Sequence, residues 1–231
     1  MIRGLDEEYQ ERIIKSAQIY ERDFNNRKLV YSYYIVDGNT KKKVRKELTV
    51  ISKPENFMHL CGITYYANKQ DFENAKKNSS KFYRDCINEV LVLENIWYES
   101  IEKINVKLQA LPQIETLLTN DVRVCEHGIF EYHRFENALR TNTAIVALTV
   151  NGSIPYSLYN LREGSANAKI AFKKHYNVGS IEVFDNRTGE KLKKISIENL
   201  PKKKSKSLYK KKKKEKQERD RERSRKQKGK E

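Results

Sequence analysis

Three short segments of this chain carry side chains that could move a proton, hold a negative charge and donate a hydrogen bond. They are NFMHLCGITY (residues 56–65) with His59, a later helical stretch with Lys107, and IPYSL (residues 154–158) with Ser157. Histidine exchanges protons near neutral pH because its unperturbed pKa is about 6.5. An ammonium group and a hydroxyl can stabilise charge on a phosphate. The three side chains form the set that metal-free cleavage of RNA would require.

The first half of the chain is predicted to be mainly helical. Residues 6–22 carry apolar side chains at intervals of three and four, which is typical of an amphipathic helix. Residues 28–36 and 44–51 are β-branched and aromatic and flank the turn DGN, so they predict a β-hairpin. In the segment that contains His59, Asn56 is expected to cap a short helix that carries Phe57, Leu60 and Cys61. Further helices are expected over residues 71–92 and 96–118, with interruptions at Asn78 and at Pro112.

The second half of the chain changes to short β-rich segments separated by Gly, Asn or Asp turns. These segments are residues 122–126, 129–134, 143–150, 169–172, 180–184 and 191–197. Helices followed by strands indicate an α+β fold rather than alternating βαβ units. We therefore expect N-terminal helices packed on an antiparallel β-sheet, with residues 1–200 as one domain.

The positive charge of the chain is concentrated at its end. The 231 residues carry a net charge of +16, and from Pro201 onward 17 Lys and Arg face 5 Asp and Glu, which gives this segment +12 and leaves +4 for residues 1–200. Residues 201–231 have no apolar face, so we expect a disordered or transiently helical tail. Such a tail binds polyanions without sequence preference; a solubility or localisation role is the alternative.

Composition narrows the remaining classes. Cys61, Cys86 and Cys125 form no CxxC pair, so neither a disulfide framework nor a zinc module is expected, and a cytoplasmic location fits. We find no signal peptide and no run of about 18 apolar residues, so no membrane partner is expected. His127 and His133 lie six residues apart beside Cys125, but no second cluster completes a metal site, and no cofactor is expected.

The order of these motifs resembles a known group of nucleases. FMHLCG after a β-hairpin, then FYRDC, then NVKLQAL and finally IPYSL are similar to the phage-associated Barnase-EndoU-colicin-RelE-like nucleases, and most of all to their fourth phage group. The resemblance spans most of residues 28–165. It implies helices packed on an antiparallel sheet and a metal-independent endoribonuclease of prophage or mobile-element origin, a toxin in conflict between phage and host. One departure is that Cys61 stands where the family usually has threonine.

The resemblance also assigns roles to residues. An enzyme that uses the 2′-OH of RNA as nucleophile needs a proton acceptor, a proton donor for the 5′-oxygen and a cation for the phosphate. We assign His59 as general base or acid, Lys107 as phosphate stabiliser and Ser157 as a hydrogen-bond donor to phosphate. Tyr156 offers a second hydroxyl beside Ser157, and the residues alone do not decide between them.

Other residues and other functions remain open at the level of sequence. His133 and Arg140 are candidate auxiliary phosphate contacts. His59 and Lys107 could equally be a turn residue and a solvated helix residue, and most of the 14 tyrosines should be structural. The alternative function is a noncatalytic RNA- or ribosome-binding protein anchored by its tail, which would tolerate dispersal of His59, Lys107 and Ser157. The expected partner is transfer, messenger or ribosomal RNA, and an immunity or regulatory protein is a further candidate.

Overall fold

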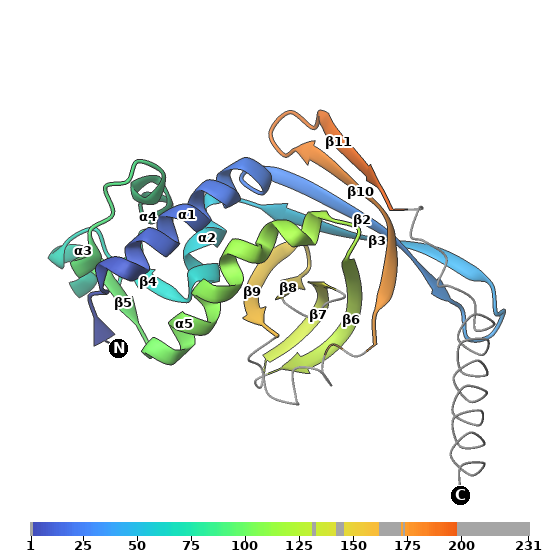
Figure 1. Cartoon of the computed structure of the whole chain (residues 1–231), viewed down its shortest axis with the longest axis horizontal. Helices are drawn as coiled ribbons and strands as arrows, with labels where there is room; N and C mark the ends of the chain where they lie inside the picture. Colours follow the sequence, from blue (N-terminus) through green and yellow to red (C-terminus); the bar gives the residue numbers. More distant parts are fainter. Residues whose placement is uncertain (1, 131–132, 142–145, 162–171, 173, 198–231) are drawn as a thin grey trace, which may run out of the picture. The chain divides into compact units, whose positions relative to one another are not determined.

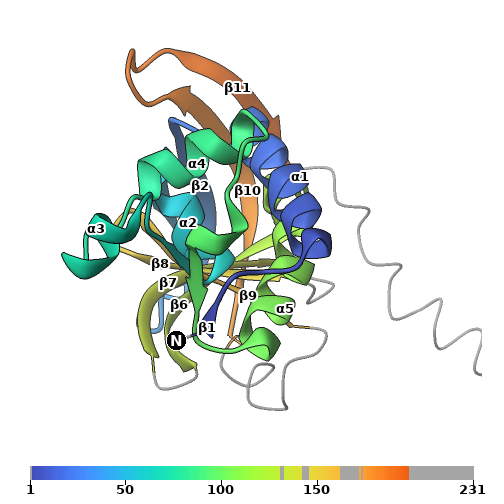
Figure 2. The same ribbon diagram turned by 90° about the vertical axis from the view of Figure 1, so that its left-hand side faces the viewer.

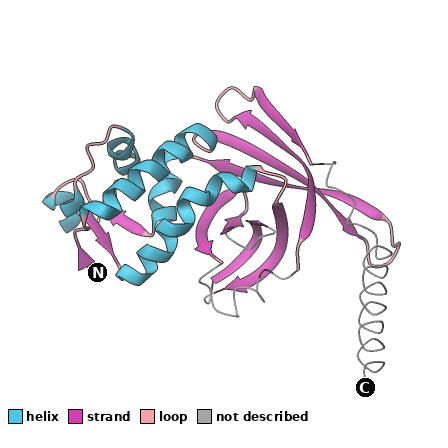
Figure 3. Ribbon diagram, in the orientation of Figure 1, coloured by secondary structure: helices cyan, strands magenta, loops and turns pink. Residues whose placement is uncertain are grey.

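The computed structural model describes residues 2–130, 133–141, 146–161, 172 and 174–197. Its helices lie to one side of a large sheet, and a small sheet joins the helices (Figures 1 and 3). The predicted α+β class, with helices and a large antiparallel sheet, is confirmed. The tail predicted from Pro201 onward lies outside the described residues.

The helical layer contains five α-helices and two 3-10 helices in the described part of the chain. They are α1 (Glu7–Asp23), α2 (Pro54–Cys61), α3 (Lys69–Glu73), α4 (Ser79–Ile87), η1 (Leu93–Asn95), α5 (Ile101–Ala110) and η2 (Leu111–Leu118). The helix predicted over residues 71–92 is two short helices, because Asn78 instead bonds Tyr65 and Asp71 and starts α4. The stretch from Ile96 opens as a strand, and Ser100 caps α5 by accepting from the Lys103 N–H at 3.3 Å.

Aromatic rings hold the helical layer together. Phe57 of α2 stacks on Phe82 of α4 with ring centres 5.9 Å apart, and Tyr20 of α1 lies 5.3 Å from Phe57. All three rings are almost completely buried. Because each buries a large apolar surface, they fix α1, α2 and α4 against one another. In Figure 2 the molecule is turned so that this helical layer faces the viewer.

The large sheet is antiparallel and has the strand order β3-β2-β10-β6-β7-β8-β9, with β11 paired to β10. Its strands are β2 (Arg27–Val36), β3 (Lys43–Ser52), β6 (Val122–Phe130), β7 (His133–Thr141), β8 (Val146–Asn151), β9 (Ile154–Asn160), β10 (Tyr176–Asp185) and β11 (Lys191–Ser196). The predicted β2–β3 hairpin is confirmed, whereas β9 was not expected from the sequence. The Ile51 N–H of β3 donates to the carbonyl of Ser153, which lies between β8 and β9, at 2.7 Å. The two edges of the sheet therefore curl toward each other.

The small sheet contains β1 (Ile2–Arg3), β4 (Ile63–Tyr65) and β5 (Ile96–Tyr98), in the order β1-β5-β4. Strand β4 follows α2 directly through Gly62, which lies in the left-handed region at φ 74° and ends the helix. In the residues that the structure describes, no helix is long and apolar enough to span a membrane.

Candidate active site

Helix α2 presents His59 by burying the residues around it. Phe57, Met58, Leu60 and Cys61 all point into the core, which leaves His59 as the outward side chain of the last turn. The helix begins at Pro54, one turn earlier than a cap at Asn56 would place it. Asn56 instead occupies the third helical position, where its side-chain oxygen accepts from the Lys53 N–H at 2.8 Å. A proline at the first helical position needs no hydrogen-bond acceptor for its nitrogen.

Lys107 comes from α5, a helix that packs on β9. The buried side chains of Ile104 and Leu108 hold this helix to the core, while Lys107 lies half-buried between them in sequence. Its ammonium donates to Ser157 Oγ at 2.9 Å and lies 5.8 Å from the centre of the Tyr159 ring. A cation over an aromatic face is attracted by the negative face of the ring. Strand β9 therefore fixes the position of the Lys107 charge.

A bulge in β9 turns two neighbouring side chains toward the same place. Thr149 of β8 pairs with Ser157, but the next pair is Val150 with Pro155, so the register shifts by one residue at Tyr156. In a regular strand, residues 156 and 157 would point to opposite faces; an extra residue changes that alternation. Tyr156 then reaches His59, with ring centres 5.9 Å apart in an edge contact.

The Ser157 backbone is held by the strand beside it. Thr149 Oγ1 accepts from the Ser157 N–H at 3.1 Å and donates to the Ser157 carbonyl at 3.2 Å. Two bonds from one buried hydroxyl keep the bulge in register, because buried polar groups are costly to leave unpaired. The threonine is thus a supporting residue that the sequence patterns did not single out.

Gly62 permits the close approach of Lys107 to His59's helix. A Cβ atom on this residue would lie 2.4 Å from Lys107 Cδ and 3.0 Å from Cε, well inside normal contact. Its φ of 74° is also a conformation that side chains rarely adopt. The glycine was visible in FMHLCG, but only the structure shows that it clears space for the lysine stem.

The electrostatic surroundings keep the His59 imidazole neutral. Partial burial lowers the pKa of His59 below its ordinary value of 6.5, and the positive charges of Lys107 and Lys77 lower it further. His59 nevertheless remains an exposed residue. A neutral imidazole that water and substrate can reach is able to accept a proton at pH 7.

The structure thus brings together four of the six predicted site residues, which we call the His59 cluster: His59, Lys107, Tyr156 and Ser157. Arg140 is buried elsewhere in the sheet, where its guanidinium donates to the carbonyls of Thr141 and Phe172. His133 opens β7 and pairs with Phe130, and its side chain lies outside the described part.

Cys61 lies beside the cluster but faces the core. Its side chain is fully buried, and burial together with the neighbouring Cys86 raises the pKa of its thiol. A side chain at this position therefore packs against the core and does not line the exposed edge of His59. Among the described residues, no three His, Cys, Asp or Glu side chains come together in a way that could hold a metal ion.

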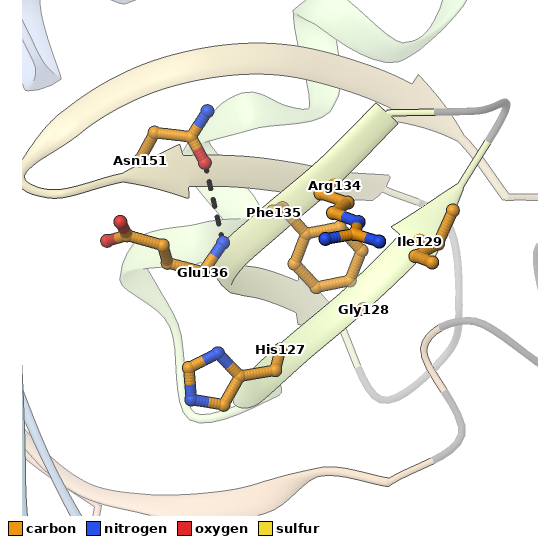
Figure 4. A pocket seen from close by; sticks show the side chains of 7 residues that line it. All are labelled: His127, Gly128, Ile129, Arg134, Phe135, Glu136 and Asn151. Atoms are coloured by element: carbon orange, nitrogen blue, oxygen red, sulfur yellow. Dashed lines mark hydrogen bonds between the residues drawn. The ribbon is translucent and has the colours of Figure 1, made fainter.

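A separate pocket of about 650 Å³ opens at the β6–β7 hairpin (Figure 4). We call it the His127 pocket; it is lined by His127, Gly128, Ile129, Arg134, Phe135, Glu136 and Asn151. The Gly152 N–H donates to Glu136 Oε2 at 2.9 Å. None of its lining residues belongs to the His59 cluster, so this hollow is separate from the cluster.

Comparison with known proteins adds one finding. A family model described as phage-Barnase-EndoU-ColicinE5/D-RelE like nuclease4 matches residues 12–227. This range contains the four residues of the His59 cluster. Searches of curated proteins and of solved structures found no significant match.

Proposed function

The chain belongs to the phage-Barnase-EndoU-ColicinE5/D-RelE like nuclease4 family, and from that premise we propose that it is a metal-independent endoribonuclease acting at the His59 cluster. The observation that carries the proposal is the convergence of the cluster. Lys107 Nζ lies 2.9 Å from Ser157 Oγ, and the Tyr156 ring of the same strand contacts His59. The three elements involved are widely separated in the sequence.

His59 serves as the general base. Its lowered pKa means that the neutral imidazole is present at pH 7 and can accept the proton of the RNA 2′-OH. The 2′-oxygen then bonds to phosphorus, and the bond from phosphorus to the 5′-oxygen breaks. The product strand ends in a 2′,3′-cyclic phosphate. DNA lacks the 2′-OH and so cannot follow this path.

Lys107 and Ser157 stabilise the phosphate as charge develops on it. The ammonium already donates to the Ser157 hydroxyl, and a phosphate oxygen within reach of both groups would receive bonds from both. The departing 5′-oxygen takes a proton, and Tyr156, exposed on the same strand beside His59, is the hydroxyl that supplies it. Preorganised donors of this kind typically contribute the largest share of rate enhancement.

The same convergence weighs against the noncatalytic alternative. An RNA-binding surface needs cations and aromatic rings spread along the nucleic acid. It has no need for a lysine directed at a serine beside a histidine with a lowered pKa. Active sites are where such perturbed groups concentrate.

The biological setting follows from the family and remains part of the proposal. We infer a prophage or mobile-element enzyme that acts as a toxin on cytoplasmic RNA and is held in check by an immunity or regulatory protein. The lysine-rich segment after Pro201 would add affinity for RNA without selecting a sequence.

The test is cleavage of total bacterial RNA by purified protein in excess EDTA, beside His59→Ala protein and with DNA of matched sequence. The proposal expects RNA fragments with 2′,3′-cyclic phosphate ends from the parent protein only, and intact DNA. Linear 3′-phosphate or 3′-hydroxyl ends at the earliest times, or equal cleavage by the variant, would contradict it.

A further inference from the structure

The β2–β3 hairpin extends beyond the sheet as a two-stranded arm, which we define as residues 34–47. Strand β10 pairs with β2 from Arg27 as far as Tyr33 and then leaves it to pair with β6. From Tyr34 to Val36, β2 is bonded only to β3 within the described residues. Figure 1 shows the hairpin projecting past β10, on the side away from the helices.

The arm carries more positive charge than its acidic residues offset. Arg45 pairs with Glu47 at 2.8 Å, and Lys46 pairs with Glu126 at 2.8 Å. Within the described part of the chain, no acidic side chain pairs with Lys41, Lys42 or Lys43.

The arm's remaining acid forms no ion pair with these lysines in the described part of the chain. Asp37 is occupied by the turn, where its Oδ1 accepts from the backbone of Asn39 and from both the backbone and the hydroxyl of Thr40. Residues 34–47 carry five Lys and Arg against two Asp and Glu, so the arm keeps a net positive charge that an outside partner can meet.

One face of the arm adds an aromatic ring to these charges. Tyr34 stands directly across from Arg45, and Val36 directly across from Lys43. Side chains opposite each other on an antiparallel pair share a face. Tyr34 is 50% exposed and Val36 61% exposed, whereas Tyr31 and Tyr33 of the same strand are buried. Lysines on a free strand edge can also serve to prevent pairing with another chain. That role would not require the exposed Tyr34 and Val36 beside them, because apolar and aromatic side chains do not protect an edge.

The arm is connected to the His59 cluster by one continuous strand. β3 runs from Lys43 to Ser52 and leads through Lys53 into α2. Ten residues at about 3.3 Å each place the tip roughly 30 Å along the strand from the start of α2. An RNA strand that contacts both the tip and the His59 cluster must span a similar distance, which requires more than a few nucleotides.

We propose that the β2–β3 arm binds the phosphate backbone of RNA substrates long enough to extend from the His59 cluster, with Lys41, Lys42 and Lys43 contacting phosphates and Tyr34 stacking on a base. Cations beside an exposed aromatic ring are the combination that holds RNA single strands. The inference takes its substrate class from the proposed function. It makes the enzyme selective for long RNA over short oligonucleotides.

The binding test uses His59→Ala protein, which leaves the RNA intact, and a labelled RNA of about 30 nucleotides at several salt concentrations. Each lost phosphate contact removes about 0.7 from the slope of log affinity against log salt. The triple change Lys41→Ala, Lys42→Ala and Lys43→Ala should therefore flatten the slope by about 2. Tyr34→Ala should weaken binding about fivefold or more at fixed salt.

The matched control removes three lysines from the other hairpin, by Lys191→Ala, Lys193→Ala and Lys194→Ala. Two of these already pair with Glu182, at 2.5 Å for Lys191 and 3.5 Å for Lys194. The control changes net charge by the same amount and should flatten the slope much less. Equal slopes for the two triple variants would overturn the inference. It would also be overturned if the arm variant bound RNA as the parent does and instead began to self-associate or lost binding of a protein inhibitor.

The cleavage test uses protein with His59 intact. The arm variant should lose kcat/KM on the RNA of about 30 nucleotides and keep the parent value on an RNA of about four nucleotides. Equal losses on both lengths would overturn the inference. If the parent cleaves neither RNA, the proposed function fails, and the salt slopes alone still decide whether the arm binds RNA. Circular dichroism melting checks that both triple variants keep the parent fold.

Discussion

The His59 cluster and the His127 pocket each contain an accessible histidine, but only the cluster surrounds its histidine with converging groups. His59 lies beside a half-buried ammonium, a hydroxyl and a phenol, and its pKa is lowered. His127 lies at an exposed hairpin with φ 42°, in a hollow of about 650 Å³ whose carboxylate is already bonded to backbone. The difference teaches that a hollow with a histidine on its wall does not identify the chemistry; convergence of donors from separate elements does.

The largest effect on kcat/KM should come from replacing His59, and replacing His127 gives the comparison. His59→Ala should lower kcat/KM for RNA cleavage about 10²–10⁴-fold, because general acid–base catalysis contributes on that scale. His127→Ala should stay within a few-fold of the parent, because none of the cluster residues lines its pocket. Initial rates on one RNA under identical conditions measure both.

A reversed result would break the comparison. If His127→Ala lost activity while His59→Ala kept it, the pocket at the β6–β7 hairpin would be the catalytic site. Melting curves of both variants distinguish such a reversal from loss of fold.

The second effect should come from the cation of the cluster. Lys107→Met keeps the aliphatic stem that packs over Gly62 but removes the charge beside Ser157. We expect kcat to fall about 10²-fold, since losing one donor to a developing oxyanion costs on that order. Lys103→Met, one turn earlier on the same helix and paired with Glu99 on the surface, is the control and should leave kcat unchanged. Equal activity of the two variants would remove Lys107 from the proposed mechanism.

Much of this fold follows from local patterns. The β2–β3 hairpin is visible because alternating aromatic and β-branched residues flank DGN, and the described structure pairs Tyr34 with Arg45 across it. The predicted helix over residues 96–118 was only partly right, because Ile96 and Tyr98 pair with β4 in a small sheet. Such pairing joins segments about thirty residues apart, and local periodicity does not contain it.

The sequence predicts the chemical groups of the site, but it does not predict the bulge and the hydrogen bonds that hold them in place. His59, Lys107 and Ser157 stand out as chemical groups, and the family resemblance orders them. The bulge at Tyr156 depends on the register between β8 and β9, which the sequence does not state. The role of Thr149 depends on the same register.

A third, smaller effect should come from the space that Gly62 leaves for Lys107. Gly62→Ala places a Cβ 2.4 Å from Lys107 Cδ and also strains a backbone at φ 74°, which costs roughly 1–2 kcal/mol. Gly189→Ala is a close control, because its φ is 75° and nothing lies within 4 Å of the added atom. Both variants should lose similar stability in denaturant melts, and only Gly62→Ala should lose kcat, about tenfold. An equal kcat in the two would show that Lys107 adjusts without cost.

The smallest effect should be a shift in pH dependence caused by Lys77. This lysine lies outside the His59 cluster, yet its positive charge lowers the pKa of His59 by disfavouring the imidazolium. Removing the charge with Lys77→Ala raises that pKa toward 6.5, so the acidic limb of kcat/KM should move to higher pH. The variant should then be slower than the parent at about pH 6, where more of its His59 is protonated, and equal to the parent at about pH 8. Lys76→Ala, its exposed neighbour, is the control and should leave the limb in place. A limb that does not move with Lys77→Ala would show that the Lys77 charge does not act on the group that titrates in this limb.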